Sequence, residues 1–406
     1  LKDKEKTQQQ PIRLTLLSTE WRPSLLDLSI IIRGLAIELA KDPHAEVSVF
    51  VPHCSEEDRR NAAGYNVQLI EAEKMVPVTH PIDWLINLPQ GHVMDCVLAY
   101  GATDGREVPY IIKKQHNCKW IQVVLEEPGK NITNLSEGEK WQQAEVEICE
   151  IADQILAIGP KLAGAYQHYF YSRNIDQTVL IYTPSIFSEI WDVPQLDVVD
   201  IKESSPFVVL LFGLSGKLEI KWWEIVAEAM SASEDETHIH ILLSSEVNTD
   251  AMERKLFDSF IRHNRLFFNV VINDSFTIAE LTNLFSEADL AIMPFWTESF
   301  ELAALGALSV GLPMLVRGSS GFGKVLKEVP LGPQCVVDSD DPKDWTKEIR
   351  AIQQKPRVVR LKEMKLIREN YSEKYNMEES SGRLLKKMLE LVSGTSSILS
   401  IKLQVK

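Results

Sequence analysis

Residues 289–313 read DLAIMPFWTESFELAALGALSVGLP, and this stretch predicts a strand, a connection and a helix. The apolar run 290–293 stops at Pro294, and a second, largely apolar segment, 300–310, stops at Gly311 and Pro313. Proline and glycine commonly end regular elements. Another short apolar run, 314–316, follows directly. A strand, a helix and a further strand in this order are the unit of a parallel α/β sheet.

The same alternation extends over the whole chain. Runs that are apolar at nearly every position are typical of parallel strands buried on both faces. They predict strands at 13–17, 46–51, 66–70, 96–100, 120–124, 154–158 and 179–182 in the first half, and at 207–212, 238–243, 268–272, 290–293, 314–316 and 335–337 in the second. Amphipathic segments between them predict helices at 28–41, 105–116, 137–151, 160–172, 221–231, 249–263, 277–287, 300–310 and 323–328. Three more helices, 342–354, 358–371 and 378–391, close the chain.

The stretch 184–206 breaks this rhythm because it is rich in Pro, Asp and Ser. Domain boundaries fall in such segments. The sequence therefore predicts two Rossmann-like parallel-sheet domains. We expect the first at 1–187, a linker at 188–206, the second at 207–374, and a final helix with a loose tail at 375–406.

Composition excludes several classes of function. The 406 residues carry 43 Lys or Arg and 58 Asp or Glu, a net charge of −15, which disfavours nucleic acid as a partner. No apolar run approaches the roughly 20 residues that span a bilayer, so no membrane span is expected. Five cysteines without CxxC spacing suggest reduced thiols in a cytoplasmic protein. The charged, Gln-rich start at Leu1 suggests a piece of a larger protein with flanking domains.

At this point the stretch 289–313 resembles the donor-site signature of retaining family-4 glycosyltransferases, D-x-x-x-x-P-S-x-x-E-G-F-G-L-x-x-L-E-A-x-A-x-G-x-P. Residues 14–52 resemble that family's first βαβ unit, and 377–379 resemble the start of its last helix. The resemblance covers nearly the whole chain. It implies a GT-B fold, in which two facing Rossmann-like domains enclose a cleft and the last helix crosses back to the N-terminal domain.

The resemblance also implies a function and a site. The first domain would face the acceptor, and the second would bind a nucleotide-sugar donor, a UDP-, GDP- or ADP-sugar, without a metal or another cofactor. A diphosphate needs backbone N–H groups and cations around it. The donor-site positions that carry over are Lys221, Glu298, Ser299, Phe300, Glu301 and Leu302. No catalytic residue is assigned.

Several of the family's donor ligands are nevertheless replaced. The loop after the first strand, 20–28, has no glycine for a close approach to phosphate. Leu214 stands where the family has an arginine, and Leu125 where it has a histidine. Glu301 replaces the second glycine of G-F-G, and Gly306 replaces the second glutamate. A hydrogen bond to a charged group contributes about 1.5–3 kcal/mol, so these losses together predict weak donor binding.

Three functions remain open at this stage. The first is a catalytically impaired pseudo-glycosyltransferase that acts as a sensor, regulatory or interaction module with a protein partner. The second is an active retaining glycosyltransferase in which Lys221 holds phosphate and Glu298 holds the donor sugar. The third is a nucleotide or phosphosugar binder that uses the turn 318–324, GSSGFGK, which matches part of a P-loop. Its structural alternative, a tight strand-to-helix turn, is favoured because Val325 replaces the Mg²⁺-binding Ser or Thr.

Overall fold

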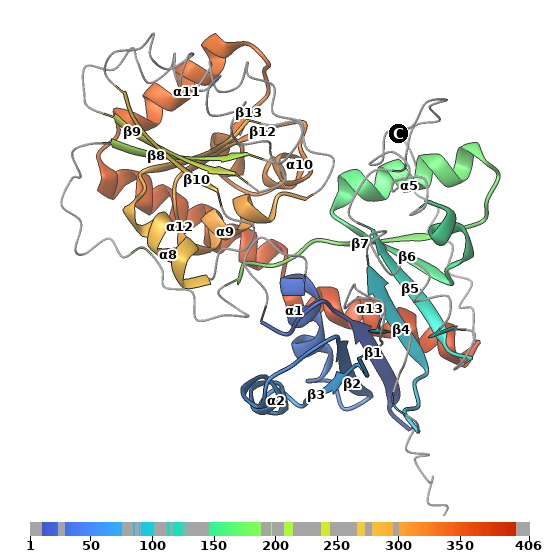
Figure 1. Ribbon diagram of the computed structural model, residues 1–406. Coiled ribbons are helices and arrows are strands. Elements are labelled where there is room, and N and C mark those ends of the chain that lie inside the picture. The colour runs from blue at the N-terminus through green and yellow to red at the C-terminus, as the bar shows by residue number, and fades with distance from the viewer. Residues whose placement is uncertain are drawn as a thin grey trace, which may run out of the picture.

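Two parallel sheets organise the computed structural model of this protein (Figure 1). The structure describes residues 10–22, 29–74, 84–85, 89, 91–100, 112–113, 117–124, 128, 146–187, 196, 207–213, 237–243, 266–272, 278–294 and 300–394. The first sheet has seven strands in the order β3-β2-β1-β4-β5-β6-β7. The second has six strands in the order β10-β9-β8-β11-β12-β13. The fold class is the one predicted, a parallel α/β protein with two sheets.

Every strand pair in both sheets is parallel. The first sheet consists of β1 (Ile12–Leu17), β2 (Ala45–Val51), β3 (Val67–Glu71), β4 (Cys96–Tyr100), β5 (Lys119–Val124), β6 (Gln154–Ile158) and β7 (Val179–Tyr182). The second consists of β8 (Phe207–Gly213), β9 (Thr237–Leu243), β10 (Leu266–Ile272), β11 (Leu290–Met293), β12 (Met314–Arg317) and β13 (Val336–Val337). All thirteen predicted strands are confirmed, because helices cover both faces of a parallel sheet and leave its strands continuously apolar.

Helices connect the strands and close the chain. They include α1 (Ser29–Leu39), α2 (Glu56–Ala63), α5 (Pro160–Ser172), α8 (Ile278–Glu287), α9 (Leu302–Val310), α10 (Gly321–Leu326), α11 (Pro342–Gln353), α12 (Arg357–Lys374) and α13 (Met377–Ser393). None of them combines the length and apolar character needed to cross a membrane. The helices predicted at 221–231 and 249–263 lie outside the described residues, as do most positions of those predicted at 105–116 and 137–151.

Helix α2 is missing from the sequence prediction. Its start is fixed by a capping box: the Ser55 hydroxyl accepts from the Asp58 amide, and the Asp58 carboxylate accepts from the Ser55 amide. Such a box supplies partners for N–H groups that the first helical turn leaves unpaired. Only Ala62 of this helix is buried. With so little apolar periodicity, the capping residues were the only sequence signal for it.

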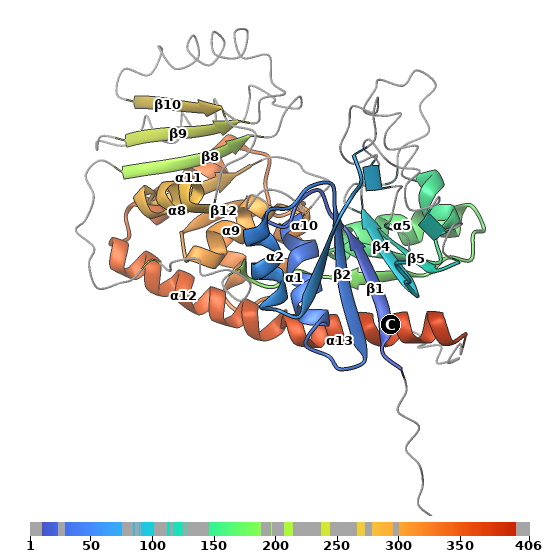
Figure 2. The same cartoon turned by 60° about the horizontal axis from the view of Figure 1, so that its bottom comes forward.

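The final helix, α13, packs against α1 of the first half of the chain. Figure 2 shows α12 and α13 following one another along one side of the molecule, from the second sheet to the first. Helix α1 is buried almost all round, with only Glu38 partly exposed. A helix that is apolar on every side is stable only when other elements pack against every side. Here the first sheet and α13 pack against α1.

An ion-pair cluster ties β11 to α12 inside the second half. Asp289, 2% exposed, accepts hydrogen bonds from Arg357 and Arg360 at 3.1 Å each through Oδ1. Its Oδ2 accepts from the Val208 amide at 3.0 Å. The first residue of the predicted signature therefore has a structural role, since one carboxylate joins β8, β11 and α12.

Residues just before the predicted linker, and Leu196 within it, pack against helices of the second half. Tyr371 donates its hydroxyl hydrogen bond to the Pro184 carbonyl at 2.8 Å, and burial raises the pKa of this phenol well above its ordinary value. The Phe187 amide donates to Ser309 Oγ at 2.8 Å, and the Leu196 amide donates to the Val310 carbonyl at 3.0 Å. The domain limits given above stay a prediction, but the change of sheet between β7 and β8 is consistent with them.

Replacing Gly382 with alanine is expected to raise the free energy of unfolding by about 0.5–1 kcal/mol. Gly382 lies inside α13, and a Cβ at this position meets nothing within 4 Å. Urea unfolding of the variant measures the change. Gly311→Ala is the matched control: Gly311 ends α9 with φ of 84°, so alanine there should be destabilising by about 1–2 kcal/mol. Changes of the same sign in both variants would contradict the prediction.

Candidate functional site

Each sheet has one point where the strand order reverses. In the first sheet it lies between β1 and β4, and in the second between β8 and β11. Open α/β sheets bind ligands in the crevice outside the carboxyl ends of the strands at this point. The candidate site is therefore built from the segments that follow β1, β4 and β11, together with the helices that start there.

Three hydroxyl groups meet at the reversal point of the first sheet. Thr19 Oγ1 lies 2.6 Å from Ser29 Oγ, and Ser29 Oγ lies 2.8 Å from the Tyr100 hydroxyl. The Thr19 amide also donates to the Tyr100 hydroxyl at 3.2 Å. Thr19 follows β1, Tyr100 ends β4 and Ser29 begins α1. Sequence reasoning missed this group because no local motif links three positions so far apart in the chain.

At the second sheet, Glu301 connects two helices that start side by side. It is the N-cap residue of α9, but its side chain makes no capping hydrogen bond there. Instead, Oε2 accepts from the Phe322 amide, at the start of α10, at 2.9 Å. An anion is stabilised by the exposed N–H groups at a helix start. The Glu301 carboxylate thus occupies the amino end of α10.

Backbone N–H groups of the turn 318–324 already donate to acceptors within the protein. Besides the Phe322 amide bound by Glu301, the Gly323 amide donates to Ser320 Oγ at 3.0 Å, and the Lys324 amide donates to the Ser320 carbonyl at 3.1 Å. A Cβ at Gly323 would lie 2.1 Å from the Arg317 carbonyl oxygen. Close packing explains this glycine, so the P-loop match marks a tight strand-to-helix turn, as the sequence analysis favoured.

Phe300 links the two halves of the chain. Its ring is 5% exposed and meets Phe322 edge-on, with centroids 5.3 Å apart. On the other side lies Gly159, which follows β6 of the first sheet: a Cβ there would be 3.0 Å from Phe300 Cδ2. The carboxyl ends of β6 and β11 therefore face each other, and α10 packs against α5 beside them.

Gly306, the position where the resemblance has a second glutamate, is buried. A Cβ built on it would lie 3.5 Å from the Phe285 ring and 3.8 Å from the Phe187 ring. A longer side chain at this position would have to displace one of these rings. The space of the missing carboxylate is thus filled by aromatic packing.

The structure brings together three of the six predicted site residues. Phe300, Glu301 and Leu302 lie at the connection between β11 and α9, with Leu302 partly buried as the first residue of the helix. Lys221, Glu298 and Ser299 lie outside the described residues, as do Leu125, Leu214 and the loop 23–28. In the described parts of the chain, no group of three or more His, Cys, Asp and Glu side chains could hold a metal ion.

The fold resembles solved glycosyltransferase structures. Sucrose-phosphate synthase from Thermosynechococcus elongatus matches with a TM-score of 0.67 and 16% identity, over 95% of this chain and 100% of that one. HepE from Anabaena, in complex with UDP and glucose, matches with a TM-score of 0.62 and 11% identity, over 93% and 100%. WaaG, a glycosyltransferase of lipopolysaccharide biosynthesis, matches with a TM-score of 0.59 and 14% identity, over 94% and 100%. These similarities show the GT-B fold.

Sequence comparison also finds glycosyltransferases as relatives of this chain. D-inositol 3-phosphate glycosyltransferase from Paenarthrobacter aurescens is 27% identical over 115 residues, which are 28% of this chain and 27% of that protein. The profile of a family described as "Family 4 Glycosyltransferase in conflict systems" matches residues 15–384. That match spans both sheets and α13 through Leu384. The chain therefore belongs to the GT4-conflict family, the family-4 glycosyltransferases of conflict systems.

Proposed function

We propose that this chain is a catalytically impaired family-4 glycosyltransferase domain that serves a conflict system as a sensor, regulatory or interaction module. The observation that carries the proposal is the position of the Glu301 carboxylate. It lies at the connection between β11 and α9 and accepts a hydrogen bond from the Phe322 amide at 2.9 Å. A diphosphate bound at the start of α9 would face this negative charge. Moving the carboxylate away would leave the Phe322 amide without its acceptor, which opposes donor binding further.

One further feature supports an impaired donor site. The position of the second family glutamate is Gly306, with Phe285 and Phe187 packed behind it. A polar group that a nucleotide sugar could contact is therefore absent at this position. All five cysteines are free, buried thiols, which supports placing the protein in the cytoplasm, where thiols stay reduced.

Thermal unfolding in the presence of UDP, GDP, ADP and their sugar conjugates at millimolar concentration tests this proposal. A ligand at roughly a hundred times its Kd stabilises a protein by about 2.7 kcal/mol. We expect no such shift for the wild-type chain. Glu301→Gly and Glu301→Gln should gain affinity, since each removes the carboxylate and the second retains the side-chain shape. A clear wild-type shift that vanishes in Lys221→Ala or Glu298→Ala would overturn the proposal.

An active retaining glycosyltransferase is the second candidate. It is favoured by the hydroxyl cluster of Thr19, Ser29 and Tyr100, which offers donors and acceptors for a sugar at the other reversal point. Among the structural neighbours, HepE is described in complex with UDP-glucose. In this reading Lys221 binds phosphate, Glu298 binds the donor sugar, and no metal takes part. Release of UDP, GDP or ADP from the matching sugar nucleotide, lost in both alanine variants, would establish it.

Nucleotide binding by the turn 318–324 is tested with the same assay. Because the Phe322 amide of that turn already donates to Glu301, and the Gly323 and Lys324 amides to Ser320, Lys324→Ala is expected to leave any nucleotide-dependent shift unchanged. The side chain of Lys324 is exposed, so its removal should not affect the fold. Loss of a nucleotide shift in this variant alone would make the turn the binding site.

A further inference from the structure

Strand β7 (Val179–Tyr182) forms an open edge of the first sheet, and among the described strands it pairs only with β6. The Tyr182 carbonyl accepts a hydrogen bond at 2.8 Å from the amide of Gly159, which follows β6. The backbone groups of Tyr182 therefore point toward β6. Since these groups alternate in direction along a strand, the N–H and C=O groups of Val179 and Ile181 point outward, away from the sheet.

The edge along β7 is apolar and accessible to solvent. Ile181 is 52% exposed, and Val179 and Leu180 are half-buried. Proteins protect open edges with short strands, charged side chains, prolines or bulges, because unpaired backbone groups can pair with a strand of another molecule. Strand β7 is short, but residues 177–183 contain no charge and no proline. The opposite edge strand, β3, by contrast ends in Glu71. The edge along β7 is therefore suited to pairing with a further strand.

Two further exposed apolar side chains flank this edge. Tyr171 lies in the last turn of α5, which packs against β7, and it is 85% exposed. Ile151 is 51% exposed, and the carbonyl of the next residue, Ala152, accepts from Gln177 Nε2 at 2.8 Å, just before β7 begins. Exposed apolar groups that gather in one place mark contact sites between proteins, where tyrosine is enriched. We call the edge of β7, with Tyr171 and Ile151, the β7 surface.

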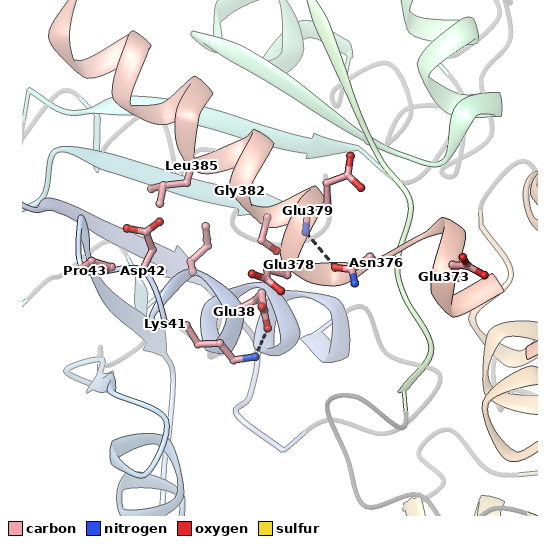
Figure 3. A pocket seen from close by; sticks show the side chains of 12 residues that line it. Glu38, Lys41, Asp42, Pro43, Glu373, Asn376, Glu378, Glu379, Gly382 and Leu385 are labelled. Atoms are coloured by element: carbon pink, nitrogen blue, oxygen red, sulfur yellow. Dashed lines mark hydrogen bonds and ion pairs between the residues drawn. The ribbon is translucent and has the colours of Figure 1, made fainter. Parts of the chain in front are cut away.

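The groove between α1 and α13 offers no such contact to a second copy of this chain (Figure 3). The acidic side chains in its lining outnumber the basic one, Lys41, and they are Glu38, Asp42, Glu373, Glu378 and Glu379. A two-fold contact places each surface against its own copy, so these carboxylates would repel one another. The chain has a net charge of −15, and two copies can therefore approach closely only where charge is sparse, as it is on the β7 surface.

We propose that β7 pairs antiparallel with β7 of a second copy, about a two-fold axis at Leu180, so that the two first sheets join into one. The strand is complementary to itself in this register. With Leu180 opposite its own copy, Val179 lies opposite Ile181 of the second copy, and Ile181 lies opposite Val179. These are the residues whose backbone groups point outward, so each pair exchanges both N–H···O bonds. Both side chains are β-branched and pack well across neighbouring strands. The pairing is independent of what the donor site binds.

Size-exclusion chromatography with light scattering, over a series of micromolar concentrations, tests the association. The wild-type chain should reach twice the mass of one chain. Ile181→Lys should weaken the dimer at least about tenfold, because pairing would remove two ammonium groups from water. Leu366→Lys is the matched control: Leu366 lies on α12 and is 50% exposed, so the charge changes equally outside the β7 surface and the dimer should persist. A wild-type chain that stays monomeric, with another segment or a different protein on β7, would overturn the proposal, as would equal dimerisation of both variants.

Cross-linking through a new cysteine tests the register, since all five native cysteines are buried. Leu180→Cys places two thiols in a non-hydrogen-bonded pair with Cα atoms about 4.5 Å apart, which a disulfide can span. In Ile181→Cys, the control, the two thiols are offset by two residues along the strands, and their Cα atoms lie about 8 Å apart, too far for a disulfide. Mild oxidation and a non-reducing gel should therefore show a linked dimer for Leu180→Cys alone. Equal linking of both variants, or none with Leu180→Cys, would show that the proposed pairing is wrong.

Discussion

Replacing Asp289 with alanine is expected to lower the free energy of unfolding by about 3–5 kcal/mol, the largest effect of any single change considered for this chain. Arg357 and Arg360 both donate to Asp289 Oδ1 at 3.1 Å, and all three residues are less than a tenth exposed. Removing the carboxylate leaves two guanidinium groups in the interior without their common anion. Urea unfolding followed by circular dichroism gives the change.

The control for Asp289 is an ion pair at the surface. Lys355 and Glu363 lie 2.7 Å apart with side chains 38% and 36% exposed. Water screens such pairs, so Glu363→Ala should cost no more than about 1 kcal/mol. If the two alanine variants lost the same stability, the buried cluster would not have the role assigned to it, and the first position of the signature would need another explanation.

Replacing Gly159 with alanine is expected to destabilise the protein by about 1–3 kcal/mol through backbone strain alone. Gly159 has φ of 85° and ψ of 162°, a conformation that is essentially restricted to glycine. The new methyl group would also lie 3.0 Å from Phe300 Cδ2, so that the ring or the backbone has to shift. The contact between the two sheets should therefore loosen as well.

A double-mutant cycle separates strain from contact. Phe300→Ala removes the ring, so the Gly159→Ala, Phe300→Ala protein should lose less stability than the sum of the single variants, with a coupling of about 0.5–3 kcal/mol. Gly91→Ala serves as the comparison, because Gly91 has φ of 87° and nothing within 4 Å of its Cβ position. Additive effects at 159 and 300 would show that the new methyl group does not clash with the Phe300 ring, and the predicted coupling would be wrong.

The sequence predicted the sheets well and the site only in part. Strands such as β4 (Cys96–Tyr100) lie in the middle of a parallel sheet, so their burial on both faces is visible as an unbroken apolar run. Helix α2 offered no such signal, because its stability begins with the Ser55 and Asp58 capping box rather than with an apolar face. A helix of this kind can be predicted from a sequence only by searching for the capping pair itself.

The position of Glu301 was predicted, but the partner of its carboxylate was not. Its hydrogen bond to the Phe322 amide joins residues twenty-one positions apart, across two connections that follow neighbouring strands. The hydroxyl cluster of Thr19, Ser29 and Tyr100 likewise depends on strand order. Both contacts follow from which strands become neighbours, a property that one sequence without its fold does not display.

The pairing of α1 with α13 has a consequence for synthesis on the ribosome. Domains generally begin to fold as they emerge, from the amino end onward. Here α1 emerges early, but the helix that covers it is translated only after the entire second sheet. The outer face of α1 therefore stays uncovered by its partner helix until translation reaches α13, so the first half completes its packing only after the second half has been synthesised.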